Sequence, residues 1–251
     1  MKFKVVIPAR LGSTRLPRKV LLPINGKPLV QHVWLAAQRS GAEEVVIATD
    51  DAEVLAACRS FGADARMTSI AHNSGTDRAN QVASEAGWSA GTLVVTLQGD
   101  EPLMPPALLG QTANLLAQDT AADIATLCHP IHGLDEWLNP NVVKVVMDRH
   151  AHALYFSRAP IPWQRDGATR ESPRLPAGLA YRHIGLYGYR VSSLARFAAL
   201  PPAPLEQCES LEQLRALAAG MRIKLAVVEQ PPPRGVDTQE DLQAVAALLH
   251  G

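Results

Sequence analysis

Four cationic side chains lie close together near the start of the chain, directly after the short apolar run 3–7. They are Arg10, Arg15, Arg18 and Lys19. A triphosphate needs a site of this kind, because its oxygens must meet several cationic or backbone N–H donors that converge from one turn. A guanidinium binds two phosphate oxygens at once, so we expect Arg10 and Arg15 to bind phosphate together with Lys19. The alternative, a solvated basic loop, is less favoured because ligands of parallel sheets bind beyond the carboxyl ends of the strands.

Two common phosphate-binding motifs are missing from the sequence. No G-x-G-x-x-G follows the first apolar run, and no G-x-x-x-x-G-K-[ST] occurs anywhere. A nicotinamide-dependent enzyme and a P-loop nucleotide hydrolase are therefore disfavoured. Asp50 ends the second apolar run, where a dinucleotide fold has its ribose-binding acid. Without the glycines we interpret Asp50 as a structural residue.

Two aspartates lie close behind glycines in predicted turns. Asp100 follows Gly99 just beyond the apolar run 92–97, and Asp237 lies two residues after Gly235. Glycine permits a ligand to approach the backbone closely at both places. Phosphoryl transfer commonly relies on Mg²⁺ held by carboxylates, and two acids at such positions meet that requirement. Taken alone, each aspartate is better explained as a turn residue or as a helix cap, Asp237 capping the terminal helix.

The composition indicates a soluble globular protein with no bias towards a polyanionic partner. Of 251 residues, 47% are hydrophobic and 19% are charged, which suffices for a sizeable core and disfavours a disordered chain. The 24 Lys and Arg residues balance the 24 Asp and Glu residues, so bulk charge gives no reason to expect nucleic acid or a membrane surface as a partner. The run 3–7 is too short for a signal peptide, and no later segment is apolar for long enough to cross a membrane.

Three cysteines, Cys58, Cys128 and Cys208, stand singly in the sequence. We expect buried thiols in a reducing compartment, and therefore a cytoplasmic protein. His150 and His152 suggest a metal pair, but no third ligand lies near them in the sequence. Their spacing is better explained by a turn between two strands.

The elements that must position these residues alternate regularly in the first half of the chain. Short β-branched runs at 3–7, 44–49, 63–67 and 92–97 alternate with helical patterns from about 28, at 52–61 and at 77–87. The runs are continuously apolar, which is typical of parallel strands covered on both faces by helices. The sequence therefore predicts an α/β protein with three layers and a mostly parallel sheet.

A smaller inserted β region is predicted at about 129–205 of an otherwise single domain, 1–251. The runs 142–147 and 151–157 flank a short turn and predict a hairpin. The stretch 160–180 is rich in proline, glycine and charge, which predicts a mobile loop. The remaining predicted elements are a strand at 181–189, a helix at 206–220, a strand at 223–228 and a terminal helix at 238–249.

Motifs distributed over almost the whole chain carry a resemblance to one family. They are IPAR at 7–10 with S-x-R-L-P-x-K at 13–19, NGKP at 25–28, ATD at 48–50, SGTDR at 74–78, QGDEP at 98–102, ALYFSR at 153–158 and GVDT at 235–238. In these motifs the chain resembles the 3-deoxy-manno-octulosonate (Kdo) cytidylyltransferase family. The resemblance implies a fold like that of nucleotide-diphospho-sugar transferases. Arg18 departs from the pattern, because the family commonly has glycine at that place.

The resemblance also implies a reaction. CMP passes from CTP to the anomeric hydroxyl of Kdo, giving CMP-Kdo and pyrophosphate as an activation step for lipopolysaccharide biosynthesis. Mg²⁺ is the implied cofactor, with Asp100 and Asp237 as its ligands, and it lowers the pKa of the attacking hydroxyl. The catalytic set is Arg10, Arg15, Lys19, Asp100 and Asp237. For Glu101, a structural role and a role behind the metal ligands both stay open.

Further residues match family positions that contact the substrates. They are Ser13, Gln98, Arg158, His183, Tyr187, Glu212 and Gln213, with Ser74, Gly75 and Arg78 in a segment that resembles the family's cytosine-recognition turn. An anionic sugar needs a cation for its carboxylate and polar groups for its hydroxyls. His183 and Tyr187 lie four residues apart in a predicted strand and so share one face. Without the resemblance, strand packing, an exposed helix face and helix capping by Ser74 or Thr76 explain these residues better.

Two alternatives stay open. A cytidylyltransferase for a related sugar acid, 8-amino Kdo or sialic acid, differs in the acceptor, although sialic-acid enzymes resemble a glycine-richer first loop. A nucleotide-binding regulator without catalysis is disfavoured by the retained acids and the basic loop. CTP and Kdo are the expected small-molecule partners, and the apolar strands of the inserted region support a homodimer, as in the family.

Overall fold

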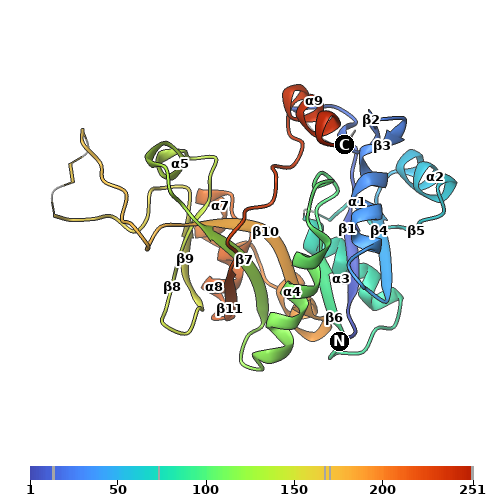
Figure 1. Ribbon diagram of the computed structural model, residues 1–251. Coiled ribbons are helices and arrows are strands. Elements are labelled where there is room, and N and C mark those ends of the chain that lie inside the picture. Colours follow the sequence, from blue (N-terminus) through green and yellow to red (C-terminus); the bar gives the residue numbers. More distant parts are fainter. Residues whose placement is uncertain (13–14, 73, 167, 170, 250–251) are drawn as a thin grey trace. The chain divides into compact units, whose positions relative to one another are not determined.

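The computed structural model describes residues 1–12, 15–72, 74–166, 168–169 and 171–249 (Figure 1). The chain divides into two compact units. Unit 1 comprises Met1–Asn114, Leu186–Ala198 and Pro232–Gly251, and unit 2 comprises Leu115–Gly185 and Ala199–Pro231. Most of the predicted inserted region, 129–205, therefore belongs to unit 2.

Unit 1 contains a mostly parallel sheet. Strand β1 (Lys4–Pro8) lies between β4 (Glu44–Thr49) and β6 (Leu93–Thr96) and runs parallel to both. β5 (Asp64–Met67) continues the sheet beyond β4, and the last residues of β10 (Tyr181–Arg190) pair antiparallel with β6. β1 is buried from its second residue to its last, as expected for a strand covered on both faces. The predicted α/β class is confirmed.

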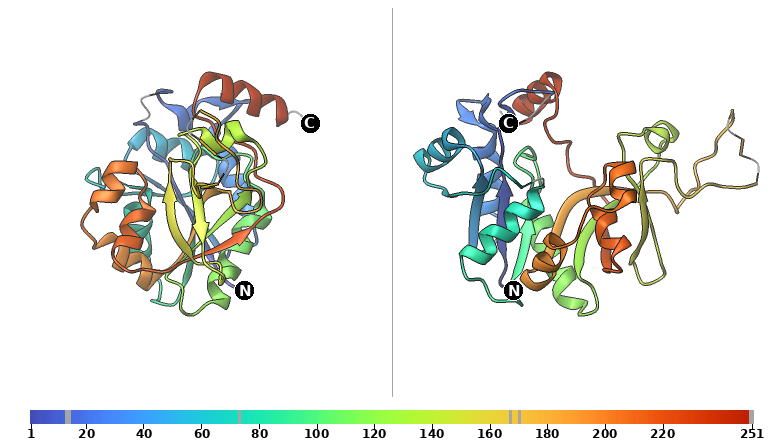
Figure 2. Two further views of the ribbon diagram at one scale, coloured as in Figure 1. Left: turned by 90° about the vertical axis from the view of Figure 1, so that its left-hand side faces the viewer. Right: turned by 180° about the vertical axis from the view of Figure 1, so that it is seen from behind.

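Helices cover both faces of this sheet. α1 (Leu29–Gln38) and α2 (Ala52–Ser60) connect strands in one direction across the sheet, whereas α3 (Gly75–Glu85) leads back from β5 to β6. Right-handed crossovers therefore put α3 on the face opposite to α1, as Figures 1 and 2 show. α6 (Val191–Ala198) packs against α3. The predicted three-layer arrangement follows from these connections.

A second apolar cluster of unit 1 joins the start of the chain to its C-terminal segment. A 3-10 helix, Lys19–Leu21, leads into the hairpin of β2 (Pro23–Ile24) and β3 (Lys27–Pro28). Ile24 and Leu29 pack there against Val236 and against side chains of α9 (Gln239–Leu248). Burial of these side chains holds the residues that precede α9 against the hairpin.

Unit 2 has strands and a core of its own. β7 (Ile124–Pro130) pairs in parallel with β11 (Ile223–Val227). β8 (Lys144–Met147) and β9 (Ala153–Ser157) form the predicted antiparallel hairpin, and β8 also pairs with the first residues of β10. The side chain of Trp137, in α5 (Leu134–Leu138), packs with Ile131, Val142 and Ala180.

One predicted helix of unit 2 is wrong in its extent. The predicted helix 206–220 is two helices, α7 (Pro204–Glu209) and α8 (Gln213–Ala218). Ser210 follows α7 and has a φ of 51°, in the left-handed region. A right-handed helix cannot continue through a residue in this conformation, so α7 ends there. The described residues of 160–180 form neither helix nor strand, as predicted for a loop, and the mobility of that loop stays a prediction.

The thiols are only partly as predicted. Cys58 and Cys128 are buried, and burial raises the pKa of each thiol to about 12. The prediction of a buried thiol is wrong for Cys208, which is exposed because α7 buries none of its residues. Among the described residues, no helix combines the length and the apolar character needed to cross a membrane.

Candidate active site

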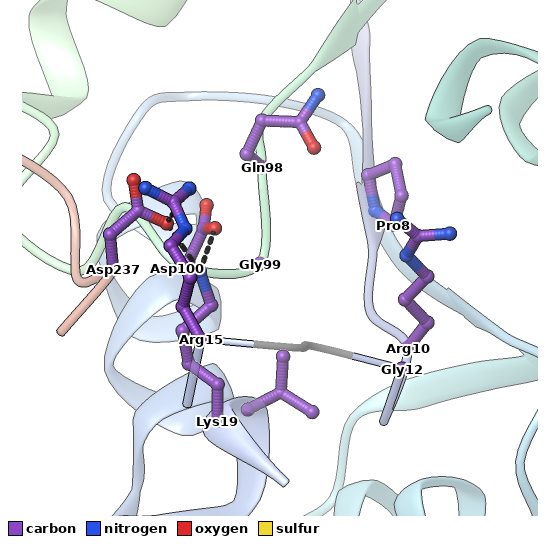
Figure 3. A pocket seen from close by; sticks show the side chains of 10 residues that line it. Pro8, Arg10, Gly12, Arg15, Lys19, Gln98, Gly99, Asp100 and Asp237 are labelled. Carbon is purple, nitrogen blue, oxygen red and sulfur yellow. Dashed lines mark hydrogen bonds and ion pairs between the residues drawn. The ribbon is translucent and has the colours of Figure 1, made fainter. Parts of the chain in front are cut away.

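A pocket of about 280 Å³ lies in unit 1, where β1 and β6 end. Its lining consists of Pro8, Arg10, Gly12, Arg15, Lys19, Val20, Gln98, Gly99, Asp100 and Asp237 (Figure 3). The structure therefore brings together all five residues predicted to be catalytic, and it adds Gln98 from the predicted substrate-binding set. β1 and β6 are adjacent and parallel, so the residues that follow them emerge at one edge of the sheet.

Lys19 connects the two aspartates of this pocket. Its Nζ atom donates to Asp100 Oδ2 at 2.6 Å and to Asp237 Oδ1 at 3.0 Å. Lys19 is only 7% exposed. Burial by itself lowers the pKa of Lys19, but the two carboxylates outweigh burial and raise the pKa above its ordinary value. Lys19 therefore stays protonated at neutral pH.

Arg15 and Arg10 add two further cations to the pocket. The Arg15 guanidinium lies 3.0 Å from Asp237 Oδ1, so this one oxygen faces both Arg15 and Lys19. The Arg15 side chain is 67% exposed, and such a pair contributes at most about 1 kcal/mol. Figure 3 shows Arg10 on the other side of the pocket, away from the two aspartates. Both guanidinium groups are thus accessible to a ligand. The predicted residue Ser13 lies outside the described residues.

Two glycines bring the aspartates together. A Cβ atom on Gly99 would lie 2.7 Å from the carbonyl oxygen of Pro8. A Cβ atom on Gly235 would lie 2.9 Å from the carbonyl oxygen of Asp100, a contact too short for any other residue. The backbone N–H of Val236 donates to that same carbonyl at 2.9 Å. The glycines were predicted to admit a ligand, whereas the structure shows that they admit the neighbouring backbone.

The capping interpretation of Asp237 is wrong. The N-cap of α9 is Thr238, whose hydroxyl accepts from Asp241 N at 3.2 Å, while Asp241 Oδ2 accepts from Thr238 N at 2.9 Å. Because this reciprocal pair completes the cap, the carboxylate of Asp237 is left to face Lys19 and Arg15.

The capping interpretation of Ser74 is confirmed. Ser74 is the N-cap of α3 and accepts from Asp77 N at 3.1 Å. Arg78 in the first turns of α3 is buried and donates to Asp50 at 2.5 Å and to Thr68 Oγ1 at 2.9 Å. Arg78 thus ties α3 to the ends of two strands, and Asp50 has the structural role expected for it. A Cβ atom on Gly75 would lie 3.0 Å from the side chain of Pro8 and 3.6 Å from Nε2 of Gln98.

The remaining predicted sugar-binding residues are divided between the units. Tyr187 belongs to unit 1 and pairs with Thr96 of β6, whereas Arg158, His183, Glu212 and Gln213 belong to unit 2. The Arg158 guanidinium donates to the carbonyl oxygens of Glu209 at 2.7 Å and Pro140 at 3.1 Å.

Within unit 2, two of these side chains have unusual surroundings. Burial, assisted by the charge of Arg182, lowers the pKa of His183 to about 3, so its ring is neutral at physiological pH. The amide nitrogen Nε2 of Gln213 is buried and has no hydrogen-bond partner among the described residues. A buried donor of this kind is costly unless a ligand or water accepts from it.

The burial of Lys144 in unit 2 was not predicted from the sequence. It is fully buried, and its ammonium donates to the carbonyl oxygens of Asn139, Val142 and Arg158. Burial lowers the pKa of Lys144 to about 8. The position of this lysine inside the apolar run 142–147 is the signal from which its burial could have been predicted.

The described residues contain no cluster of three or more His, Cys, Asp or Glu side chains able to hold a metal ion. The suggested pair of His150 and His152 therefore gains no further ligand. Asp100 and Asp237, however, direct one oxygen each at a single cationic atom, Nζ of Lys19. Mg²⁺ in phosphoryl-transfer sites commonly binds one or two carboxylates, with water and substrate phosphates completing its octahedron. Two converging carboxylates beside three cations fit that requirement.

Comparisons with known proteins agree with this chemistry. A family model described as cytidylyltransferase matches residues 4–223. The 3-deoxy-manno-octulosonate cytidylyltransferase of Marinobacter nauticus is 54% identical over 254 residues, covering 99% of this chain and 97% of the relative. The enzyme of the same name from Pseudomonas syringae pv. tomato is 53% identical, with 98% of each chain covered.

Two solved structures are similar over almost the full length. One is described as CMP:2-keto-3-deoxy-manno-octonic acid synthetase complexed with CTP, with a TM-score of 0.89, 41% identity and coverage of 100% of this chain and 99% of the other. A cytidylyltransferase from Leptospira borgpetersenii has a TM-score of 0.62 and 16% identity, with 99% of this chain and 86% of the other covered, and so shares the fold.

Proposed function

Because this chain belongs to the family of 3-deoxy-manno-octulosonate cytidylyltransferases, we propose that it transfers CMP from CTP to the anomeric hydroxyl of 3-deoxy-D-manno-octulosonate. The products are CMP-Kdo, a precursor for lipopolysaccharide biosynthesis, and pyrophosphate. One observation carries the proposal: three cations from the opening loop and carboxylates from two remote turns line a single pocket.

The cations bind the triphosphate. Arg10 and Arg15 are exposed at the pocket and have the planar donor arrangement that matches phosphate oxygens. Lys19 supplies a compact charge from the interior of the pocket. Attack of the anomeric oxygen on the α-phosphorus forms one P–O bond and breaks the bond to the β-phosphate, so the charge that leaves with pyrophosphate is met by these cations.

Mg²⁺ is the proposed cofactor, with Asp100 and Asp237 as the residues that hold it. When bound, it neutralises phosphate charge and lowers the pKa of the attacking hydroxyl. The carboxylates also orient the cations of the pocket, because Asp237 Oδ1 faces both Arg15 and Lys19.

Each unit contains residues that are proposed, on the family resemblance, to contact a substrate. Gln98 and Tyr187 are retained as proposed contacts in unit 1, and His183 and Glu212 are retained as proposed contacts in unit 2. Arg158 offers a cation for the carboxylate. The buried Nε2 donor of Gln213 supports this assignment, because a sugar hydroxyl could accept from it. Ser13, Ser74, Gly75 and Arg78 are retained as proposed contacts to CTP, with Arg78 acting through the backbone that it fixes.

A pyrophosphate-release assay with purified protein, CTP, Kdo and Mg²⁺ tests the function. We expect Asp100→Asn to lower turnover by about 100-fold or more, because one metal-binding carboxylate is lost. Asp166→Asn is the matched control, since the Asp166 side chain is 95% exposed outside the pocket, and it should retain normal turnover. Normal turnover in Asp100→Asn would remove Asp100 from the mechanism.

The same assay distinguishes the acceptors. Kdo, 8-amino Kdo and sialic acid are compared at equal concentration, and we expect Kdo to give the highest kcat/KM. A higher kcat/KM for 8-amino Kdo would mean that the acceptor is 8-amino Kdo, while the proposed transfer of CMP from CTP would still hold. CTP binding without exchange of labelled pyrophosphate would instead favour the non-catalytic regulator.

A homodimer and a cytoplasmic location complete the proposal. The β8–β9 hairpin exposes Leu154, whose apolar side chain is available for association. The three cysteines are free thiols, which is compatible with a reducing compartment.

A further inference from the structure

Lys19 holds both of the carboxylates that are proposed to bind the divalent cation. Its Nζ atom lies 2.6 Å from Asp100 Oδ2 and 3.0 Å from Asp237 Oδ1. These distances are those of direct charge-assisted hydrogen bonds. Figure 3 shows both carboxylate groups turned towards this one side chain. The ammonium therefore occupies one oxygen atom of each carboxylate that is proposed to bind the metal ion.

The position of Lys19 is fixed by the fold. Lys19 starts the 3-10 helix Lys19–Leu21, and the next side chain, Val20, is buried. The backbone N–H of Leu22 closes this turn by donating to the carbonyl oxygen of Lys19 at 3.1 Å. The Lys19 side chain is 9% exposed, in contrast to 67% for that of Arg15. The fold thus holds Lys19 in a buried position next to the two carboxylates, whereas Arg15 contacts Asp237 from the solvent-exposed side.

We propose that Lys19 competes with the divalent cation for Asp100 and Asp237, so that the protein binds metal tightly only after a triphosphate has drawn the ammonium onto its own oxygens. The inference rests on the proposed function for one point, the assignment of the two aspartates as metal ligands. It adds a binding order: the nucleotide arrives before the metal or together with it.

Electrostatics gives the reason for the competition. An ammonium and a divalent cation that are bound to the same two carboxylates repel each other, so each weakens the binding of the other. The metal must also give up part of its hydration shell, which Mg²⁺ does reluctantly unless anionic ligands replace the water. A triphosphate supplies additional anionic oxygens, and lysine is a common phosphate ligand, so the ammonium and the metal then have separate partners.

Metal binding to the nucleotide-free protein tests the proposal directly. Mn²⁺ alone is the probe, and its bound fraction is measured by electron paramagnetic resonance for the wild type, Lys19→Met and Lys19→Gln. We expect the wild type to bind Mn²⁺ weakly and both variants to bind it about tenfold more tightly or better, because the competing charge is gone. Lys27→Met is the matched control, since Lys27 is an exposed lysine of unit 1 outside the pocket, and it should bind Mn²⁺ like the wild type.

Two further measurements make the result specific. The gain in affinity should disappear when Asp100→Asn is combined with Lys19→Met, because the carboxylate is then absent. Mn²⁺ should also raise the Tm of Lys19→Met more than that of the wild type, since a ligand stabilises the folded state that binds it. Circular dichroism confirms that each variant is folded, and Lys19→Gln provides a second variant if Lys19→Met does not fold.

The proposal is overturned if folded Lys19 variants bind Mn²⁺ no more tightly than the wild type, or if the gain survives the loss of Asp100. Either result would leave the proposed function intact as long as the wild type releases pyrophosphate from CTP and Kdo. Absence of that release would contradict the proposed function and says nothing about metal binding to the nucleotide-free protein. The two failures are therefore distinguishable.

Discussion

Arg18 adopts a backbone conformation that favours glycine. Its φ is 59° and its ψ is 23°, in the left-handed region, directly before Lys19. A residue with a Cβ atom is strained there by about 1–2 kcal/mol relative to an ordinary conformation. The family that the chain resembles commonly has glycine at this place, and the left-handed backbone supplies the physical reason. The Arg18 guanidinium pairs with Glu53 of α2, an exposed contact that offsets part of the strain.

Comparison of two variants at this position isolates the strain. Arg18→Gly and Arg18→Ala both lose the pair with Glu53, but only glycine relieves the backbone. We expect Arg18→Gly to be more stable than Arg18→Ala by about 1 kcal/mol in urea unfolding.

Arg39 serves as the control for this comparison. Arg39 is the C-cap of α1 and has an ordinary φ of −81°, so glycine relieves no strain at this position. We therefore expect Arg39→Gly to be less stable than Arg39→Ala. Equal free energies of unfolding for the two Arg18 variants would mean that the left-handed backbone at residue 18 is not strained by a Cβ atom.

The contact between Lys19 and Asp237 shows where prediction of individual residues from sequence ends. Lys19 was predicted for the site from the cluster of cations in its loop, and Asp237 from the family resemblance. Their direct pairing depends on Gly235 passing close to the carbonyl of Asp100, a contact between distant segments that no local pattern encodes. The cap of α9, in contrast, is a local pattern: Thr238 and Asp241 lie three residues apart, and this spacing was the signal against Asp237 as the cap.

At the scale of elements, the predicted strands and helices of the first 97 residues were found, whereas several elements between residues 106 and 218 were missed or wrong in extent. The predicted strand 44–49 coincides with β4, and the predicted hairpin corresponds to β8 and β9, each of which begins two residues later than predicted. The two-helix arrangement of 204–218 was not predicted, because serine at 210 is not a recognisable helix breaker. Helix α4 (Pro106–Gln118) and strand β7 were not predicted either, although Leu108, Leu109 and Leu116 supply a helical apolar spacing in α4.

The cap of α9 is the element whose removal should be measurable. Thr238 and Asp241 satisfy each other's backbone N–H groups directly after Asp237. We expect Thr238→Ala to lower the free energy of unfolding by about 1 kcal/mol, because one backbone donor of the first turn loses its partner. Thr120→Ala, at an exposed position outside any helix or strand, is the control in the same urea titration and should be neutral. An unchanged unfolding midpoint in Thr238→Ala would show that water replaces the hydroxyl without loss.

At the scale of the whole molecule, association can be tested with two leucines of equal exposure. Leu154 in β9 is 62% exposed and Leu248 in α9 is 64% exposed. If the inserted region forms the proposed homodimer, the native mass by light scattering should be twice 27.0 kDa. Leu154→Glu should then shift the protein towards the monomer, since a buried charge opposes association, while Leu248→Glu should not. A monomeric wild type, or a dimer broken only by Leu248→Glu, would contradict the proposal.

The return of the chain to unit 1 after Pro231 has a consequence for synthesis on the ribosome. β1, β6, Lys19 and Asp100 are all made within the first half of the chain, but Asp237 belongs to Pro232–Gly251. Until that segment has left the exit tunnel and packed beside Ile24, a nascent chain has one carboxylate of the pair and its Lys19 has a single partner there. The pair of carboxylates around Lys19 is therefore completed only after Pro232–Gly251 has been made, when most of the sheet of unit 1 can already have formed.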